Sequence, residues 1–179
     1  MGRYRYAAQY CEENVWHLAA EPDLLGETRY AVFVSNRGRR CPMWAQRAGK
    51  GGLIVWDYHA ALLTTGASGA LIYDLDTTLP HPCALDAWLA GSFRPELSLP
   101  PDLRPKFRVV EAGELRAGFR SDRSHMRRPN GRWLAPPPPW PAIMPEGSTF
   151  DLMQAIDMDA AGPGEVFDLE ELAARFGAD

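Results

Sequence analysis

Residues 53–76 read LIVWDYHAALLTTGASGALIYDLD. Two runs rich in β-forming residues, 53–65 and 70–76, lie on either side of the small residues at 66–69. This pattern predicts an antiparallel hairpin with a four-residue loop. Once the residues next to the loop are paired, every other pair in the hairpin follows, and a slip by one residue would turn all side chains to the opposite face. The hairpin therefore sets the register on which the rest of the fold is built.

Three polar side chains belong to this hairpin: His59 in the first run, and Asp74 and Asp76 in the second. If Thr65 pairs with Ala70, His59 lies opposite Asp76 and diagonally across from Asp74. Side chains alternate between the faces of a strand, so all three share one face, and a diagonal separation of roughly 7 Å is within reach of a ring side chain. The register alone leaves open which aspartate contacts the histidine.

Outside the hairpin, hydrophobic spacing and capping residues predict further elements. The first helix begins at Cys11 and places Val15 and Leu18 on one stripe, and the last is capped by Asp168 together with Glu171. We expect helices over 11–18, 82–93, 114–119, 150–156 and 169–176, strands over 30–35, 43–45 and 106–110, a polar loop over 121–133 with its turn at 130–131, and an extended polyproline strap over 136–139. This order predicts a mixed α and β fold around one sheet.

Composition narrows the class of protein. The 179 residues, of which 46% are hydrophobic and 23% charged, suit one globular domain, and we expect a single domain over 1–179. A net charge of -4 with scattered basic residues disfavours nucleic acid as a partner. No apolar run approaches the ~18 residues of a membrane-spanning helix. The 3 cysteines show no spacing typical of a zinc site, which favours a reducing, cytoplasmic location.

Cys11, His59 and one of the two aspartates can supply a nucleophile, a base and an orienting carboxylate, which is the logic of a catalytic triad. A cysteine at the start of a helix feels the positive end of the helix dipole, and a nearby imidazolium would favour the thiolate at neutral pH. The backbone N–H of the same residue could bind an oxyanion. The neighbouring Glu12 and Glu13 oppose thiolate formation, so the ion pair with His59 would have to dominate.

Structural interpretations compete with this one. A cysteine near a helix start is more often a small buried hydrophobic residue, and a strand histidine beside an aspartate is usually structural. Cys83, at an expected helix start, is a rival thiol, and His125 in the polar loop is a rival base, whereas we expect His17 and His81 to face solvent. No phosphate-binding loop and no cluster of metal ligands occurs, so no cofactor and no metal are expected. Several aromatic residues have the spacing of core residues, namely Trp16, Phe33, Trp44, Trp56 and Trp88.

Four sequence motifs resemble those of a known protein family, namely YCEEN at 10–14, YAVFVSN at 30–36, WDYH at 56–59 and IYDLDT at 72–77. The chain resembles the protein N-terminal glutamine amidohydrolase family. The similarity covers nearly everything from Tyr10 onward and continues through further motifs, namely KFRV at 106–109, SDRSHM at 121–126, PPPP at 136–139 and RFG at 175–177. Motifs this long, in the same order, make the resemblance highly specific.

The resemblance implies a single-domain papain- or transglutaminase-like α/β (α+β) fold with a mostly antiparallel sheet flanked by helices. It implies hydrolysis of the side-chain amide of an N-terminal glutamine to glutamate and ammonia, with Cys11 as nucleophile, His59 as base and Asp74 as acid. We expect no cofactor, peptides or proteins with a free N-terminal Gln as partners, and a cytoplasmic monomer. In eukaryotic members the product enters the N-degron pathway through arginylation.

The substrate's ammonium is expected to meet a carboxylate or backbone carbonyls, and Glu12, Asp57 and Asp76 are the candidates. Two other interpretations remain at this point. A thiol protease or transglutaminase of the same fold would share the triad but would act on internal residues. A non-catalytic binder of protein N-termini would keep the pocket without the chemistry.

Overall fold

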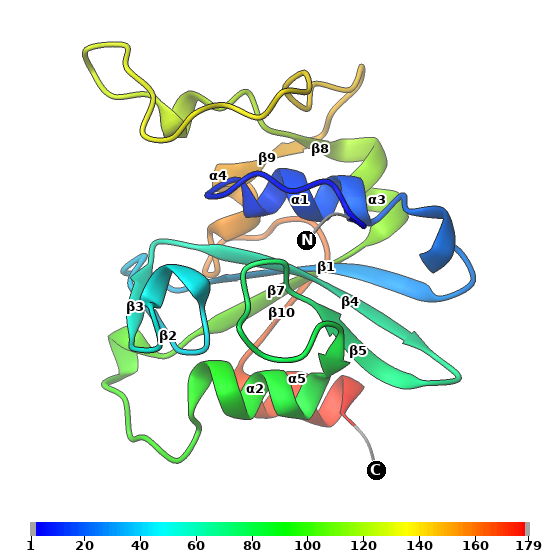
Figure 1. Ribbon diagram of the computed structural model, residues 1–179, viewed down its shortest axis with the longest axis vertical. Coiled ribbons are helices and arrows are strands. Elements are labelled where there is room, and N and C mark those ends of the chain that lie inside the picture. Colours follow the sequence, from blue (N-terminus) through cyan, green and yellow to red (C-terminus); the bar gives the residue numbers. More distant parts are fainter. Residues whose placement is uncertain (1–2, 178–179) are drawn as a thin grey trace.

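A six-stranded sheet runs through the middle of the protein in a computed structural model that describes residues 3–177 (Figure 1). Its strand order is β10-β7-β1-β4-β5-β6, and all neighbouring strands are antiparallel. Two small two-stranded sheets, β2 with β3 and β8 with β9, lie beside it. The strands are β1 (Thr28–Ser35), β2 (Cys41–Met43), β3 (Ile54–Trp56), β4 (His59–Gly66), β5 (Gly69–Tyr73), β6 (Cys83–Ala84), β7 (Lys106–Glu111), β8 (Phe119–Arg120), β9 (Phe150–Asp151) and β10 (Glu165–Phe167).

Helices cover both faces of this sheet. In Figure 1, α1, α3 and α4 lie above it, and α2 and α5 lie below. The α-helices are α1 (Cys11–Leu18), α2 (Leu85–Phe93), α3 (Ala112–Gly118), α4 (Leu152–Ile156) and α5 (Leu169–Phe176). Short 3-10 turns are found at Pro22–Leu24, Arg47–Gly49, Pro101–Leu103 and Ser124–Met126. The α+β fold class with an antiparallel sheet flanked by helices is therefore confirmed.

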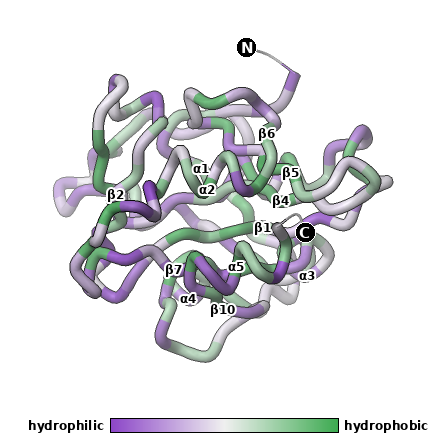
Figure 2. Tube along the Cα trace, turned by 90° about the horizontal axis from the view of Figure 1, so that it is seen from below, coloured by the Kyte–Doolittle hydropathy of each residue, from purple (hydrophilic) through white to green (hydrophobic). Residues whose placement is uncertain are grey.

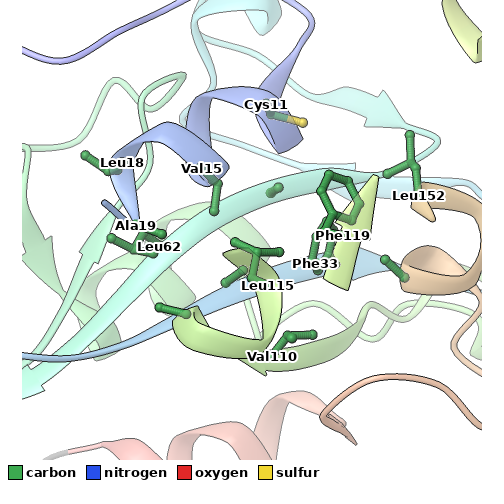
Figure 3. Close-up of a cluster of buried hydrophobic side chains, with 14 of the residues drawn as sticks. Cys11, Val15, Leu18, Ala19, Phe33, Leu62, Val110, Leu115, Phe119 and Leu152 are labelled. Carbon is green, nitrogen blue, oxygen red and sulfur yellow. The ribbon is translucent and has the colours of Figure 1, made fainter. Parts of the chain in front are cut away.

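Two apolar cores result, one on each face of the sheet. Phe33 of β1 points into the core beneath α1, α3 and α4, part of which Figure 3 shows, whereas its neighbour Val32 points into the core over α2 and α5. Since both faces are covered, β1 is apolar on both sides rather than alternating. Figure 2 shows the same arrangement from below, with hydrophilic colouring gathered on the outer loops. Within residues 3–177, none of the helices has the length and apolarity of a membrane-spanning segment.

The hairpin has the predicted register. Thr65 pairs with Ala70, and Leu62 pairs with Tyr73. The second strand is shorter than expected, because the chain leaves the sheet at Asp74, whose carboxylate accepts a hydrogen bond from the backbone N–H of Asp76 at 2.9 Å. This side-chain turn replaces the last three residues of the expected strand.

The expected strand over 53–65 is also divided. It breaks at Asp57, whose side chain accepts a hydrogen bond from the backbone N–H of Tyr58 at 3.0 Å, while its carbonyl accepts one from the hydroxyl of Ser35 at 2.8 Å. The part before the break becomes β3 and pairs with β2, and the part after it becomes β4 and pairs with β1. The break therefore separates Trp56, at the end of β3, from His59, at the start of β4.

Helix starts differ from the predictions in two places. The chain over 82–84 does not join α2, because Cys83 is paired with Ile72 in the edge strand β6. Likewise α4 begins at Leu152, because Phe150 pairs with Phe119 in a parallel bridge between β9 and β8. Cys83 therefore does not lie at a helix start, which removes the argument for it as a rival thiol. The cap of the last helix is confirmed, since Asp168 and Glu171 exchange hydrogen bonds with each other's backbone N–H.

Candidate active site

Helix α1 places the thiol of Cys11 at the wall of a small cavity. The helix begins at Cys11 itself, after a residue with non-helical backbone angles, and no side chain caps its N-terminus. The cysteine is 8% exposed and lines the cavity, whose volume is about 150 Å³. The lining residues are Gln9, Cys11, Trp56, Asp57, Tyr58, His59, Asp76, His125, Met126 and Leu134.

His59 lines the same cavity from the first residue of β4. Its ring nitrogen Nε2 lies 2.9 Å from Oδ1 of Asp74, and both side chains are almost completely buried. Because Nε2 is engaged by the carboxylate, Nδ1 is the ring nitrogen left for proton transfer. The structure thus brings the three residues Cys11, His59 and Asp74 to one place, from a helix, a strand and the turn that follows a strand.

The carboxylate of Asp74 is held by four donors. Oδ1 faces His59 and the backbone N–H of Asp76, while Oδ2 accepts hydrogen bonds from Nε2 of Gln46 at 2.9 Å and from Nε1 of Trp88 at 3.0 Å. Burial alone would raise the pKa of Asp74, but the nearby imidazole and these hydrogen bonds outweigh it and lower the pKa to about 2. Asp74 is therefore ionised and fixed in orientation.

The pKa values of His59 and Cys11 are both raised by their surroundings. Burial lowers the pKa of His59, but the charge of Asp74 and the hydrogen bond to it outweigh burial, so that this pKa lies above its ordinary value. Burial, and then the charges of Glu12 and Asp76, raise the pKa of Cys11 well above its ordinary value. This shift favours the protonated thiol, contrary to the thiolate expected at neutral pH.

Comparison with known proteins places this arrangement in a family. The model of the N-terminal glutamine amidase family matches residues 6–176, a span that contains Cys11, His59 and Asp74. We call these three residues the relay. The chain belongs to the N-terminal glutamine amidase family. Relatives named "Protein N-terminal glutamine amidohydrolase" include those of Drosophila grimshawi, 43% identical over 180 residues (96% of this chain and 87% of the relative), and Homo sapiens, 42% identical over 180 residues (97% and 88%).

The rival base His125 also reaches the cavity of this family member. Its Nε2 lies 3.2 Å from the hydroxyl of Tyr58, and that hydroxyl donates a hydrogen bond to Oε2 of Glu12 at 2.8 Å. Oε2 of Glu12 in turn lies 4.0 Å from the sulfur of Cys11. Nε2 of His125 also lies 3.6 Å from Oε1 of Glu12, a longer contact than the 2.9 Å between His59 and its carboxylate. Burial lowers the pKa of His125, so that its neutral form is favoured.

Glu12 is the unexpected member of that network. It is completely buried, and besides Tyr58 it accepts a hydrogen bond from the hydroxyl of Ser121 at 3.3 Å. Burial raises the pKa of its carboxyl to about 7, although the hydrogen bond from Tyr58 acts in the opposite direction. A second carboxyl group beside the thiol of this amidase therefore changes its charge near neutral pH.

Glu13 ties the long polar loop to α1. Its carboxylate receives two hydrogen bonds from the guanidinium of Arg123, at 2.6 and 2.8 Å, and a third from Nε1 of Trp140 at 2.7 Å. The same guanidinium donates to the backbone carbonyl of Trp140 at 2.8 Å. We call these three residues the loop clamp. Because His125 and Met126 follow Arg123 directly, the clamp positions one wall of the cavity.

Predictions about one aromatic and one histidine residue need revision. Trp56, expected in the core, is partly buried and packs against the core over α2 and α5, but it also lines the cavity, and its ring is stacked on that of His59 with an angle of 16° between the planes and 6.2 Å between the centroids. His17, expected to face solvent, is half-buried and packs edge-on against Trp16 and Trp140. His81 is exposed, as predicted.

One group of side chains among residues 3–177 has metal-ligand spacing, and it overlaps the relay. Ligand atoms of His59, Asp74 and Asp76 all lie within 4.8 Å of one another. Protein donors already occupy both oxygens of Asp74, and Nε2 of His59 faces the same carboxylate. This donor pattern fits a hydrogen-bonded relay better than a set of metal ligands.

Proposed function

We propose that this protein hydrolyses the side-chain amide of an N-terminal glutamine, which gives N-terminal glutamate and ammonia, with Cys11, His59 and Asp74 as its catalytic triad. The observation that carries the proposal is the direct contact of His59 with Asp74 at the wall of a cavity that Cys11 also lines, in a chain of the N-terminal glutamine amidase family. Substrates are then peptides and proteins with a free N-terminal Gln.

The first half of the reaction forms a thioester. As Nδ1 of His59 takes the thiol proton, the sulfur of Cys11 attacks the δ-carbonyl carbon of the substrate. Asp74 stabilises the imidazolium that results, which fits the pKa of His59 being raised by this carboxylate in spite of burial. The imidazolium then gives its proton to the amide nitrogen, the C–N bond breaks, and ammonia leaves.

The second half restores the enzyme. Water adds to the thioester carbon while His59 removes one of its protons, and the C–S bond then breaks to release the glutamate side chain. The proton returns to the sulfur, so Cys11 ends as a thiol. The negative oxygen of each tetrahedral intermediate is served by the backbone N–H of Cys11, because the first N–H groups of a helix lack partners within the helix.

Ammonia release from a Gln-initiated peptide tests the proposal. The wild-type protein should release ammonia, and Cys11→Ala should reduce the rate by at least about 1,000-fold, because the step that makes the thioester is lost. Cys83→Ala serves as the control, since Cys83 is buried in β6 away from the cavity lining. A Cys11→Ala variant as active as the wild type would refute the assignment.

A panel of first residues separates this activity from related ones. Asn-initiated peptides should react slowly, because one methylene fewer moves the carbonyl away from the sulfur. Cleavage of the peptide backbone, or incorporation of an added amine at internal glutamines, would instead identify a thiol protease or a transglutaminase. Binding of Gln peptides without any ammonia release would identify a non-catalytic binder.

We further propose that the sheet and its helices form a papain- or transglutaminase-like fold, as the family resemblance implies. Residues 1–179 are proposed to form one domain, and the protein is proposed to act as a monomer in the cytoplasm without a cofactor. Size-exclusion chromatography with light scattering checks the oligomeric state, and full activity after dialysis against a chelator checks the absence of a metal requirement.

A further inference from the structure

The cavity next to Cys11 is lined by acidic groups without a balancing arginine or lysine. Among its lining residues, Asp57 and Asp76 are carboxylates, and none is an arginine or a lysine. Asp74 lies directly behind His59 and is ionised, so that protonation of the imidazole compensates only that one charge. A positively charged group from a ligand would therefore meet a favourable field in this cavity.

An N-terminal glutamine brings such a charge to a defined distance. Four covalent bonds separate its α-nitrogen from the δ-carbon that the sulfur attacks, which places the ammonium at most roughly 5 Å from the reacting carbon. The carboxylate that binds this ammonium must consequently lie close to the triad itself. A group on the outer rim of the cavity would be too far away.

Asp76 has the required position. It lies half-buried at the end of the turn after β5, with a carboxylate oxygen within 4.8 Å of the ligand atoms of His59 and Asp74. Its Oδ1 accepts a hydrogen bond from the hydroxyl of Tyr6 at 2.6 Å. Among residues 3–177, Tyr6 is the only side chain that donates to this carboxylate, so Oδ2 is left for a ligand. The group is thus held from one side and available from the other.

The other two candidate carboxylates are placed less well. Glu12 is completely buried, is bonded to Tyr58 and Ser121, and is absent from the cavity lining. Asp57 lines the cavity but is exposed, and its Oδ1 accepts a hydrogen bond from the next backbone N–H. An exposed carboxylate forms a weaker ion pair than a partly buried one, because water screens it.

We propose that Asp76 binds the α-ammonium of the substrate and thereby restricts the enzyme to chain termini, with Tyr6 holding the carboxylate in place. The inference rests on the proposed function and deepens it. It also gives the ammonium a second effect. After burial and Glu12, the charge of Asp76 is the next cause that raises the pKa of Cys11, so a bound ammonium neutralises a charge that opposes formation of the thiolate.

The test compares two substrates in matched variants. Ammonia release is measured for a Gln peptide with a free N-terminus and for its N-acetylated form, with wild type, Asp76→Asn, Asp57→Asn and Glu12→Gln. Wild type should prefer the free amine. Asp76→Asn should reduce kcat/KM for the free amine by about 10- to 100-fold, the range expected for one charge-assisted hydrogen bond, and should not reduce the slow rate on the acetylated peptide.

Alkylation of Cys11 by iodoacetamide gives a second readout. Without substrate, Asp76→Asn should be alkylated several-fold faster than wild type at the same pH, because the thiolate no longer faces this charge. Loss of fold would also expose the buried thiols and speed their alkylation, so Cys41 and Cys83, which are buried as well, serve as internal controls and should not be alkylated faster in Asp76→Asn. Tyr6→Phe, which keeps Asp76 but removes its donor, should show a smaller loss that is again confined to the free amine.

Several outcomes would overturn the inference. Equal losses of Asp76→Asn on both peptides would show that Asp76 supports the triad rather than the ammonium. Loss of selectivity in Asp57→Asn or Glu12→Gln, with Asp76→Asn unaffected, would move the ammonium to another carboxylate. If wild type releases no ammonia from any Gln peptide, the proposed function itself fails, and the two failures are therefore distinguishable.

Discussion

At the scale of single residues, the carboxylates of the site differ in the hydrogen-bond donors that surround them. Asp74 has four donors and is fixed as an anion, whereas Glu12 is buried with hydroxyl donors and keeps its proton up to about neutral pH. Two acidic side chains within one site therefore differ in charge because their surroundings differ. Asp74 can support an imidazolium. At mildly acidic pH Glu12 is protonated, so it places no full negative charge beside the thiol of Cys11.

Glu12 should make the stability of the protein depend on pH. Burial raises the pKa of its carboxyl from an ordinary value of 4.5 to about 7, so the folded state binds this proton more tightly than the unfolded chain. The stabilisation is present in full below pH 4.5 and is lost as the pH rises to 7. Over that range wild type should lose about 3 kcal/mol of unfolding free energy relative to Glu12→Gln, measured by urea unfolding at pH 5 and pH 8. Parallel pH dependence in the two proteins would contradict this.

Sequence reasoning finds the residues of the relay but not their supports. Residue types and the hairpin register point to Cys11, His59 and one of two aspartates, and only the family resemblance selects Asp74 over Asp76. Gln46 and Trp88 carry no such signal, since each lies far along the chain and is an ordinary amide or aromatic residue until the fold brings it to Oδ2 of Asp74. Tyr58 has a weak signal in the sequence, because it directly precedes His59, the proposed base.

At the scale of elements, the long polar loop that begins at residue 121 has little regular structure and is tied to the rest of the protein by side-chain hydrogen bonds. It extends beyond α1, where Figure 1 draws it in yellow. The loop clamp fastens it at Arg123 and Trp140, and the hydroxyl of Tyr10 adds a hydrogen bond to the carbonyl of Ala135 at 3.1 Å. Arg123 adopts a left-handed backbone angle φ of 63°, which is unfavourable for a residue with a side chain and is compensated by the ion pair.

Breaking the clamp should destabilise the protein and open the cavity wall. Arg123→Ala leaves the completely buried carboxylate of Glu13 without its cation, which costs about 3–5 kcal/mol. Arg128→Ala is the matched control, because Arg128 lies in the same loop with its side chain exposed, and it should change stability by less than about 0.5 kcal/mol. Chemical denaturation measures both. Equal small effects of the two substitutions would show that the clamp is not stabilising.

Element boundaries were predictable only where local signals decide them. The register of the hairpin and the cap of α5 follow from short-range chemistry, and both are confirmed. The start of α2 could not be predicted, because Cys83 is drawn into the edge of the sheet by pairing with Ile72, a partner distant in sequence. Strand β10 was missed altogether, since its three residues carry no pattern of their own and form a strand only against β7.

At the scale of the whole molecule, the site connects the two cores. Cys11 belongs to the core beneath α1, whereas Trp88 is completely buried in the core over α2 and α5 and reaches Asp74 with its indole N–H. The relay therefore lies where elements from both faces of the sheet meet. Composition and hydrophobic pattern predict a mixed fold around one sheet, but they do not show that the core residue Trp88 donates a hydrogen bond to Asp74 from the far face.

Trp88→Phe should separate packing from catalysis. The variant removes one donor to Asp74 and some core volume, and it should lower stability by about 1–3 kcal/mol and lower kcat on a Gln peptide by roughly 10-fold. Leu172→Ala, in the same core but without a hydrogen bond to the site, should cost about 2–5 kcal/mol and leave the activity of the folded protein unchanged. Measuring kcat well below both melting temperatures checks this. Equal kcat in the two variants would refute the support role of the indole.

The contact between Tyr6 and Asp76 matters for the choice of labelling positions. The hydroxyl of Tyr6 donates to Asp76, so a substitution or a label at Tyr6 would alter the hydrogen bonding of a carboxylate that lines the cavity. Helix α5 lies on the other side of the sheet (Figure 1). Fluorescent labels and surface attachment therefore belong on α5, away from the cavity.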